Sequence, residues 1–89
     1  MKHITIKVTG HVQGVYFRVS ALEKANELGL KGTVRNDADG GVSLEAEGSE
    51  EQIELLIQWC RQGPSRAKIE NVTSREGKFV GYKSFEIVR

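Results

Sequence analysis

Two kinds of apolar spacing alternate along this chain, and their order restricts the folds that it can adopt. Residues 4–8 alternate apolar and polar side chains, which is the period-2 pattern of a strand with one buried face. A stretch with apolar residues three positions apart follows, as expected for a helix, and both patterns then recur. Because 89 residues suffice for one domain, the sequence predicts that residues 1–89 form a single unit around one core.

The first predicted helix follows the first strand after an apolar loop. Gly10 is expected to end the strand, and Gly29 suits the left-handed position that often follows the last turn of a helix. The spacing predicts a buried helix face formed by Val19, Leu22, Ala25 and Leu28.

A hairpin is predicted next. Residues 32–36 and 42–46 both have strand-like patterns, and residues 37–41 between them contain two Asp and two Gly. These residue types favour a tight turn, so the two strands are expected to pair with each other.

The second predicted helix has clear signals at both ends. Ser49 and Gln52 have the spacing of a capping box at its start, and Gly63 and Pro64 end it. Its apolar stripe consists of Ile53, Leu56, Ile57 and Cys60.

The remaining residues complete the fold prediction. Residues 67–73 and 82–88 are strand-like, with a turn predicted at residues 75–77 between them. The order is strand, helix, strand, strand, helix, strand, with a short last strand. This order is typical of a ferredoxin-like α+β sandwich, in which an antiparallel sheet carries both helices on one face.

Charge and cysteine content limit the partners of this chain. The 13 Lys and Arg residues nearly balance 12 Asp and Glu residues, which leaves no basic footprint for nucleic acid or membrane lipid. The single cysteine, Cys60, excludes an internal disulfide and a cysteine-rich zinc site. We expect no secretory signal, because residues 4–8 alternate apolar and polar side chains instead of forming a continuous apolar stretch. We therefore expect a monomeric, cytoplasmic protein that binds a small molecule.

Several residues are expected to have structural rather than chemical roles. His3 and His11 are predicted to face solvent, and Tyr16 and Phe17 are predicted to anchor the loop before the first helix. Cys60 is predicted to be a small buried apolar residue. A solvated acidic face is predicted at Glu45, Glu47, Glu50 and Glu51.

The start of the first helix lacks a capping side chain. None of residues 13–17 is a Ser, Thr, Asp or Asn, so the free N–H groups of the first turn need another partner. Open amides beside a glycine, here Gly14, suit a phosphate or sulfate ion. Arg18 in the first turn can lean back over the loop and bind such an anion through two hydrogen bonds. From these residues alone, an anion site and a hydrated loop with an exposed arginine both stay open.

Residues 10–18 resemble a signature of the acylphosphatase family. They read Gly-His-Val-Gln-Gly-Val-Tyr-Phe-Arg, which matches the family's Gly-x-Val-Gln-Gly-Val-x-aromatic-Arg pattern. Thr33 departs from the second family signature, which usually has an aromatic residue there, and we expect this to affect packing rather than chemistry. The rest of that signature has its counterpart in residues 32–36, Gly40, Val42 and Gly48.

The resemblance implies hydrolysis of acyl phosphates to a carboxylate and inorganic phosphate, without a metal or an organic cofactor. It assigns Arg18 to clamping the phosphate oxygens and Asn36 to orienting the attacking water. The backbone amides that it assigns to the phosphate cradle are those of Gln13, Gly14, Val15, Tyr16, Phe17 and Arg18.

The chemistry of these residue types agrees with that assignment. Phosphoryl transfer requires mainly positioning and stabilisation of charge on the phosphate oxygens. The acyl group leaves as a weakly basic carboxylate, so strong acid catalysis is unnecessary. Neither motif contains a suitably placed His or carboxylate, so we expect a phosphate oxygen of the substrate to accept the proton of the water.

Other functions on this fold lead to different expectations. A non-catalytic anion-binding or regulatory domain would keep the cradle without turnover. An RNA-binding module would carry aromatic residues on the open sheet face, where this sequence has Thr5, Lys7, Ser43, Glu45 and Glu47. We therefore expect an acyl phosphate as substrate, phosphate or sulfate as a competing anion, and neither nucleic acid nor a membrane as partner. Neither motif contains an evident pocket for the acyl group, which predicts broad selectivity.

Overall fold

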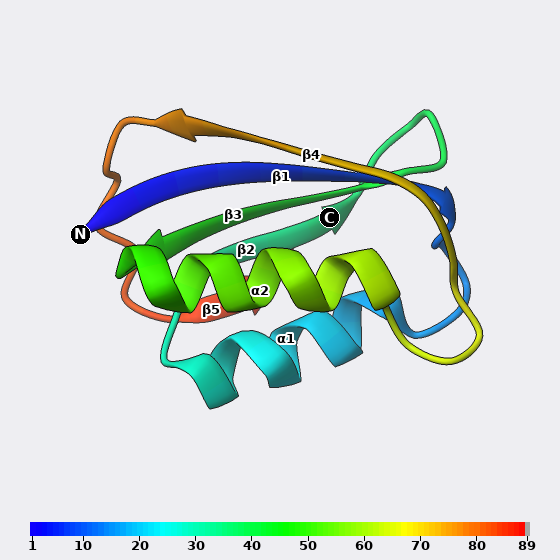
Figure 1. The fold of residues 1–89 in the computed structure, drawn as a ribbon, viewed down its shortest axis with the longest axis horizontal. Helices are drawn as coiled ribbons and strands as arrows, with labels where there is room; N and C mark the ends of the chain where they lie inside the picture. Colours follow the sequence, from blue (N-terminus) through cyan, green and yellow to red (C-terminus); the bar gives the residue numbers. More distant parts are fainter. Residues whose placement is uncertain (89) are drawn as a thin grey trace.

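The computed structural model describes residues 1–88, so Arg89, the last residue of the predicted domain, lies outside the described residues. The elements follow one another in the order that the sequence predicts, and their arrangement confirms the ferredoxin-like α+β fold (Figure 1). They are β1 (Lys2–His11), α1 (Phe17–Leu28), β2 (Lys31–Asn36), β3 (Val42–Gly48), α2 (Glu50–Gln62), β4 (Lys68–Gly77) and β5 (Phe85–Ile87).

The five strands form one sheet in the order β4-β1-β3-β2-β5, and both helices lie on one of its faces (Figure 1). Neighbouring strands are antiparallel from β4 to β2, but β5 runs parallel to β2. The prediction of a purely antiparallel sheet is therefore wrong at this edge. The chain leaves β4 at the end of the sheet where β2 begins, so β5 starts from that same end and takes the direction of β2.

The bounds of β1 and β4 also differ from the sequence prediction. Gly10 does not end β1; the register against β4 shifts between Thr9 and Gly10, and the strand continues to His11. Gly10 has a φ of 126°, and a side chain there would collide with the carbonyl of Lys68. Residues 75–77 form the end of β4 rather than a turn, because β1 supplies hydrogen-bonding partners along their length.

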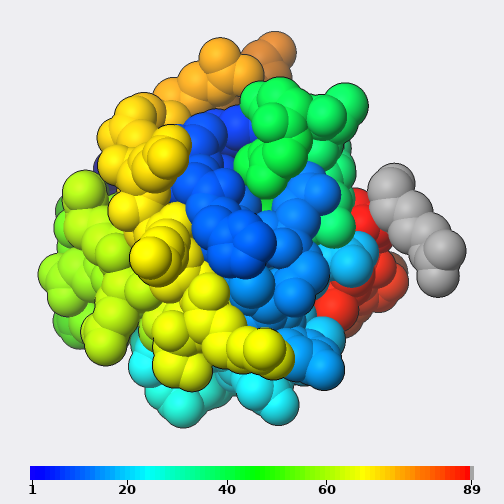
Figure 2. All heavy atoms as spheres, turned by 90° about the vertical axis from the view of Figure 1, so that its right-hand side faces the viewer, coloured from blue at the N-terminus to red at the C-terminus, as the bar shows by residue number. Residues whose placement is uncertain are grey.

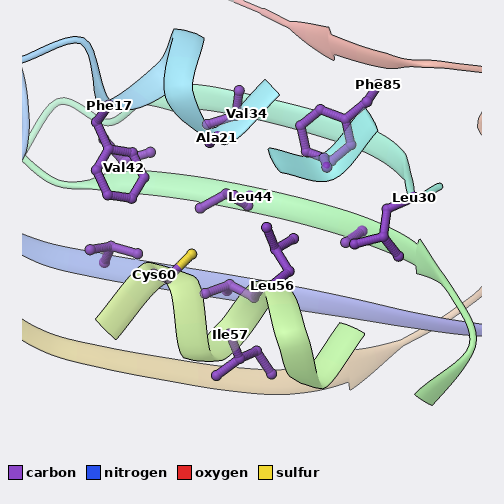
Figure 3. Close-up of a cluster of buried hydrophobic side chains, with 14 of the residues drawn as sticks. Phe17, Ala21, Leu30, Val34, Val42, Leu44, Leu56, Ile57, Cys60 and Phe85 are labelled. Atoms are coloured by element: carbon purple, nitrogen blue, oxygen red, sulfur yellow. The ribbon is translucent and has the colours of Figure 1, made fainter. Parts of the chain in front are cut away.

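The hydrophobic core lies between the sheet and the two helices (Figure 3). The predicted stripe of α2 is buried, and the predicted capping box at its start is formed, with the Ser49 hydroxyl accepting from the Gln52 N–H at 3.1 Å. The predicted face of α1 is partly wrong, because Val19 is 47% exposed. The fully buried residues of α1 are instead four positions apart, at Phe17, Ala21 and Ala25.

A short segment, Lys78–Ser84, carries the chain from β4 at one edge of the sheet to β5 at the other edge. Four strand spacings amount to about 19 Å. A seven-residue segment spans at most roughly 23–25 Å, so it must cross with little slack. We call residues 78–84 the crossing segment.

The crossing segment is held by a buried carboxylate of β3. Glu47 accepts hydrogen bonds from the backbone N–H groups of Val80 at 2.6 Å, Gly81 at 2.9 Å and Tyr82 at 3.1 Å. The His3 Nδ1 lies 2.7 Å from the same carboxylate. The predictions that Glu47 belongs to a solvated acidic face and that His3 faces solvent are therefore wrong, because both side chains are almost fully buried.

These contacts determine the charge state of Glu47. Burial by itself raises the pKa of a carboxyl group, but the hydrogen bonds from Val80, His3, Gly81 and Tyr82 outweigh burial and lower the pKa of Glu47 to about 2. Glu47 is therefore ionised. Its carboxylate accepts hydrogen bonds from three backbone N–H groups of the crossing segment, which would otherwise lack a partner.

Glu47→Gln should destabilise the protein at neutral pH. The amide has no charge and brings its own donors towards the backbone N–H groups, so we expect the free energy of unfolding to fall by about 2–4 kcal/mol. Urea denaturation at pH 7 measures this loss. Glu54→Gln on the exposed side of α2 is the matched control, with an expected change below about 0.5 kcal/mol.

The pH dependence of the same loss has a definite sign. The pKa of Glu47 is lower in the folded protein, about 2, than its ordinary value of 4.5 in an unfolded chain. Its contribution to stability is thus complete above pH 5 or so and disappears as the pH falls towards 2. The difference in stability between wild type and Glu47→Gln should shrink over that range, and a difference that stays constant from pH 7 to pH 2.5 would contradict the assignment.

Candidate active site

Two side chains of the loop between β1 and α1 point into the protein. Val12 and Val15 are buried in the core, and their packing holds the loop against the rest of the protein. Gly14 has a φ of 74° and Tyr16 a φ of 63°, both in the left-handed region. For Tyr16 this conformation costs about 1–2 kcal/mol, and such strain is typical of backbone that is shaped for a ligand.

The start of α1 has no side-chain cap, as the sequence predicts. Tyr16 occupies the cap position without making a capping hydrogen bond, and the first turn contains no acidic residue. The N–H groups of Phe17, Arg18 and Val19 therefore have no acceptor within the helix. They add to the positive end of the helix dipole, which favours an anion.

Arg18 lies beside these amides and is half-buried. Within residues 1–88 it makes no ion pair with a carboxylate, unlike Lys7 and Arg35, which pair with aspartates of the turn between β2 and β3. Its guanidinium is therefore available to an anionic ligand at the start of α1.

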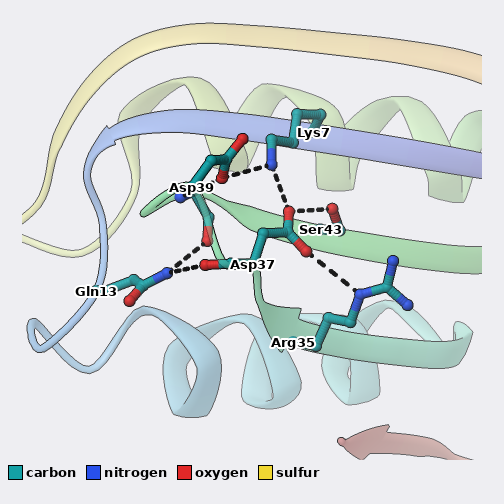
Figure 4. Close-up of polar contacts among 7 residues, drawn as sticks. Lys7, Gln13, Arg35, Asp37, Asp39 and Ser43 are labelled. Atoms are coloured by element: carbon teal, nitrogen blue, oxygen red, sulfur yellow. Dashed lines mark hydrogen bonds and ion pairs between the residues drawn. The ribbon is translucent and has the colours of Figure 1, made fainter. Parts of the chain in front are cut away.

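The Gln13 side chain ties this loop to the turn between β2 and β3. Its Nε2 donates to the backbone carbonyls of Asp37 at 2.8 Å and Gly41 at 2.9 Å (Figure 4). These two bonds connect the first motif of the sequence to the second. Sequence reasoning assigned only the backbone amide of Gln13 to the site, and the position of the glutamine in the motif was the one available signal of this further role.

A charged network fixes the turn itself (Figure 4). The Asp37 carboxylate accepts from Lys7, from the Ser43 hydroxyl and from the Arg35 Nε, the last at 3.3 Å. Burial tends to raise the pKa of Asp37, but these three donors outweigh it and hold the pKa below its usual range. Asp39 accepts from Lys7 at 3.0 Å and from the N–H of Gly41 at 2.9 Å. Both aspartates therefore serve to shape the turn.

Asn36 is the last residue of β2, directly before this turn. It shares a sheet face with the buried Val34, because side chains of one strand alternate between faces, and so it points to the side where α1 begins. Its Oδ1 is buried and has no hydrogen-bond partner within residues 1–88. A buried acceptor without a partner is rare, and it indicates a position that a water molecule or a ligand completes.

These features meet around one pocket of about 400 Å³. Figure 2 views this end of the molecule, where the loop, the turn and the C-terminal strand come together. Of the predicted site residues, Gly14, Tyr16, Phe17, Arg18 and Asn36 line the pocket, whereas Gln13 and Val15 do not. The other lining residues are Val12, Val19 and Ile87.

Other chemistry-bearing groups lie away from this pocket. Cys60 is buried as predicted, and burial raises the pKa of its thiol to about 12, which leaves no thiolate nucleophile. Tyr16 does line the pocket but is 70% exposed, so of the two predicted loop anchors only Phe17 is buried. Among residues 1–88, no group of three His, Cys, Asp or Glu side chains could hold a metal ion.

A comparison with known protein families places the chain in a family. The family model described as Acylphosphatase matches residues 4–87. The chain belongs to the acylphosphatase family. As a member of this family it is a hydrolase, and the resemblance that the two sequence motifs indicate is confirmed.

Relatives and solved structures extend the similarity over the whole chain. The acylphosphatase of Methylococcus capsulatus is 46% identical over 100% of this chain and 98% of its own length. The crystal structure of the acylphosphatase from Bacillus subtilis matches with a TM-score of 0.96 at 32% identity, over 100% of both chains. The structure of an acylphosphatase from Coxiella burnetii matches with a TM-score of 0.94 at 39% identity, covering 98% of this chain and 92% of that one.

In the part of the chain that the structure describes, neither helix has the length and apolar character that crossing a membrane requires. The predicted cytoplasmic location stays a prediction.

Gln13→Ala should loosen the connection between the loop and the turn. We expect the free energy of unfolding to fall by about 1–2 kcal/mol, because two hydrogen bonds are lost, although each carbonyl keeps one backbone N–H donor. A small displacement of positioning groups can lower turnover by about 100-fold, so kcat/KM for an acyl phosphate should fall by about 10- to 100-fold. Gln58→Ala on the exposed face of α2 is the control, and equal activity of the two variants would contradict a positioning role for Gln13.

Proposed function

We propose that this protein hydrolyses the carboxyl–phosphate bond of acyl phosphates, with water attacking phosphorus in the pocket at the start of α1. The observation that carries the proposal is the convergence of three unsatisfied groups on one pocket. These are the uncapped N–H groups of α1, the guanidinium of Arg18 and the partnerless Oδ1 of Asn36. The N–H groups and the guanidinium suit the oxygens of a phosphate, and the Oδ1 suits the water that attacks it.

The amides and Arg18 would bind the phosphate. In the proposed complex, the backbone N–H groups of residues 13–18 surround the phosphate oxygens, and the guanidinium of Arg18 binds two of them. As charge on the equatorial oxygens is redistributed in the transition state, these fixed donors need no reorganisation to stabilise it. The loop amides and Arg18 themselves stabilise the negative charge on the phosphate oxygens. The proposed mechanism therefore needs no metal and no organic cofactor.

Asn36 would orient the water. Its side chain has both donors and an acceptor, and the Oδ1 can accept a hydrogen bond from a water placed in line with the scissile bond. The leaving carboxylate is weakly basic, so no acid has to protonate it. The proton of the water passes to a phosphate oxygen of the substrate, and no protein side chain acts as general base.

The absence of a protein base has a measurable consequence. Activity should show no titration that shifts when His3, His11, Asp37 or Asp39 is substituted singly. Inorganic phosphate and sulfate should compete with the substrate for the same donors. We further propose that the protein acts as a monomer, because the site is formed from one chain.

Arg18→Ala should remove most of the activity. Loss of one preorganised donor to a developing charge lowers turnover by about 10²- to 10³-fold, and the loss of Arg18 should be at least this large. Binding of inorganic phosphate should weaken with it. Hydrolysis of benzoyl phosphate and calorimetric titration with phosphate measure the two effects, and Arg61→Ala at the end of α2 is the control.

Asn36→Ala should separate turnover from binding. We expect kcat to fall while the affinity for phosphate stays close to that of wild type, because Asn36 contacts the water rather than the phosphate. Equal losses of phosphate affinity in the Asn36 and Arg18 variants would contradict this division. A wild-type protein that binds phosphate without hydrolysing benzoyl phosphate would instead be a non-catalytic anion-binding domain.

A further inference from the structure

On the proposed function, the phosphate occupies the amide side of the pocket, and the acyl group must lie against the remaining wall. Two of the residues in that wall lie outside both sequence motifs. Val19 comes from the first turn of α1, and Ile87 comes from β5 at the C-terminal edge of the sheet. We propose that Val19 and Ile87 bind the acyl group and that the enzyme prefers acyl phosphates with an apolar acyl group larger than acetyl.

The exposure of these side chains supports the proposal. Val19 is 47% exposed and Ile87 is 37% exposed, and Tyr16, which also lines the pocket, is exposed as well. Single apolar residues on a surface need no explanation. Here three exposed side chains, two from the start of α1 and one from β5, line the same pocket, which is the pattern of a ligand site.

The lining of the pocket combines a few polar groups with apolar side chains, as binding of an acyl phosphate requires. Among residues 1–88, Arg18 is the only charged side chain that lines the pocket, and Asn36 the only other polar one apart from the Tyr16 hydroxyl. An acyl group with its own charge would therefore find no partner at the wall of Val19 and Ile87. An alkyl or phenyl group would replace water on both side chains. A pocket of about 400 Å³ leaves room for such a group beside the phosphate.

Both wall residues are held by regular structure. Ile87 pairs with Val34 of β2, and the N–H of Val88 donates to the carbonyl of Val34 at 2.9 Å. The crossing segment brings β5 to this edge, and the bonds of Glu47 to that segment fix its path. Val19 lies on α1 between the buried residues Phe17 and Ala21. The wall is therefore preorganised rather than formed by a loose tail.

The test compares the hydrolysis of benzoyl phosphate and acetyl phosphate by wild type, Val19→Ala and Ile87→Ala. One methylene in a closed apolar pocket changes kcat/KM by about 10-fold or more. For a half-open wall, we expect each substitution to lower the ratio of kcat/KM for benzoyl phosphate over acetyl phosphate by about 3- to 10-fold, mainly through KM. Leu55→Ala is the matched control, since Leu55 is 44% exposed on α2, and its ratio should equal that of wild type.

Two conservative variants keep the test interpretable if truncation disturbs folding. Ile87→Val retains a β-branched side chain in β5 and should restore most of the ratio, whereas Val19→Thr keeps the shape of valine with a hydroxyl and should lower it. The inhibition constant of inorganic phosphate reports whether the cradle is intact in each variant. Ratios that are the same in the Val19, Ile87 and Leu55 variants would overturn the proposal.

A binding measurement separates this inference from the proposed reaction. Benzoylphosphonate and acetylphosphonate are stable analogues that release no phosphate, and calorimetry gives their affinities. If wild type hydrolyses neither acyl phosphate but binds benzoylphosphonate several-fold more tightly, and Val19→Ala or Ile87→Ala removes the difference, the apolar subsite is supported and the reaction is not. If wild type hydrolyses both substrates but neither substitution changes the ratio or the affinities, the reaction is supported and the subsite is overturned.

Discussion

The pairing of β1 with β3 at the centre of the sheet determines where the other parts of this molecule lie. The two strands are antiparallel in register from Lys2 opposite Gly48 to Val8 opposite Val42. The loop that follows β1 and the turn that precedes β3 therefore leave the sheet at the same end, where Gln13 connects them. At the opposite end, the same pairing places His3 beside Glu47, and their side chains hold the crossing segment that leads to β5.

The candidate site contains several features that are energetically unfavourable by themselves and that the surrounding structure holds in place. Tyr16 has a left-handed backbone, the first turn of α1 has no cap, and the Oδ1 of Asn36 has no partner within residues 1–88. Each of these features is unfavourable without a ligand. Burial of Val12 and Val15 below the loop keeps the arrangement in place, because moving either side chain would expose apolar surface. The resulting rigidity suits a reaction that depends on positioned donors.

Sequence reasoning succeeded where the signal and its effect lie within a few residues. The capping box of α2, the left-handed Gly29 after α1 and the uncapped start of α1 all follow from neighbouring residue types. It failed where distant segments decide. Glu47 alternates with apolar residues and so resembled a solvated position, but a segment more than thirty residues later covers it. Val19 fitted the expected helix face, but the sheet contacts the face of Phe17, Ala21 and Ala25 instead.

By itself, the sequence determined the order of the elements, the fold class and the family, because periodicity, caps and motifs are local properties of the chain. It also singled out Arg18 and Asn36, whose roles stay predictions. Only the tertiary structure decided the direction of β5, the burial of Glu47 and the meeting of Val19 with Ile87 at one pocket. Burial and pocket shape depend on which segments, far apart in sequence, lie against one another, and no local pattern encodes that proximity.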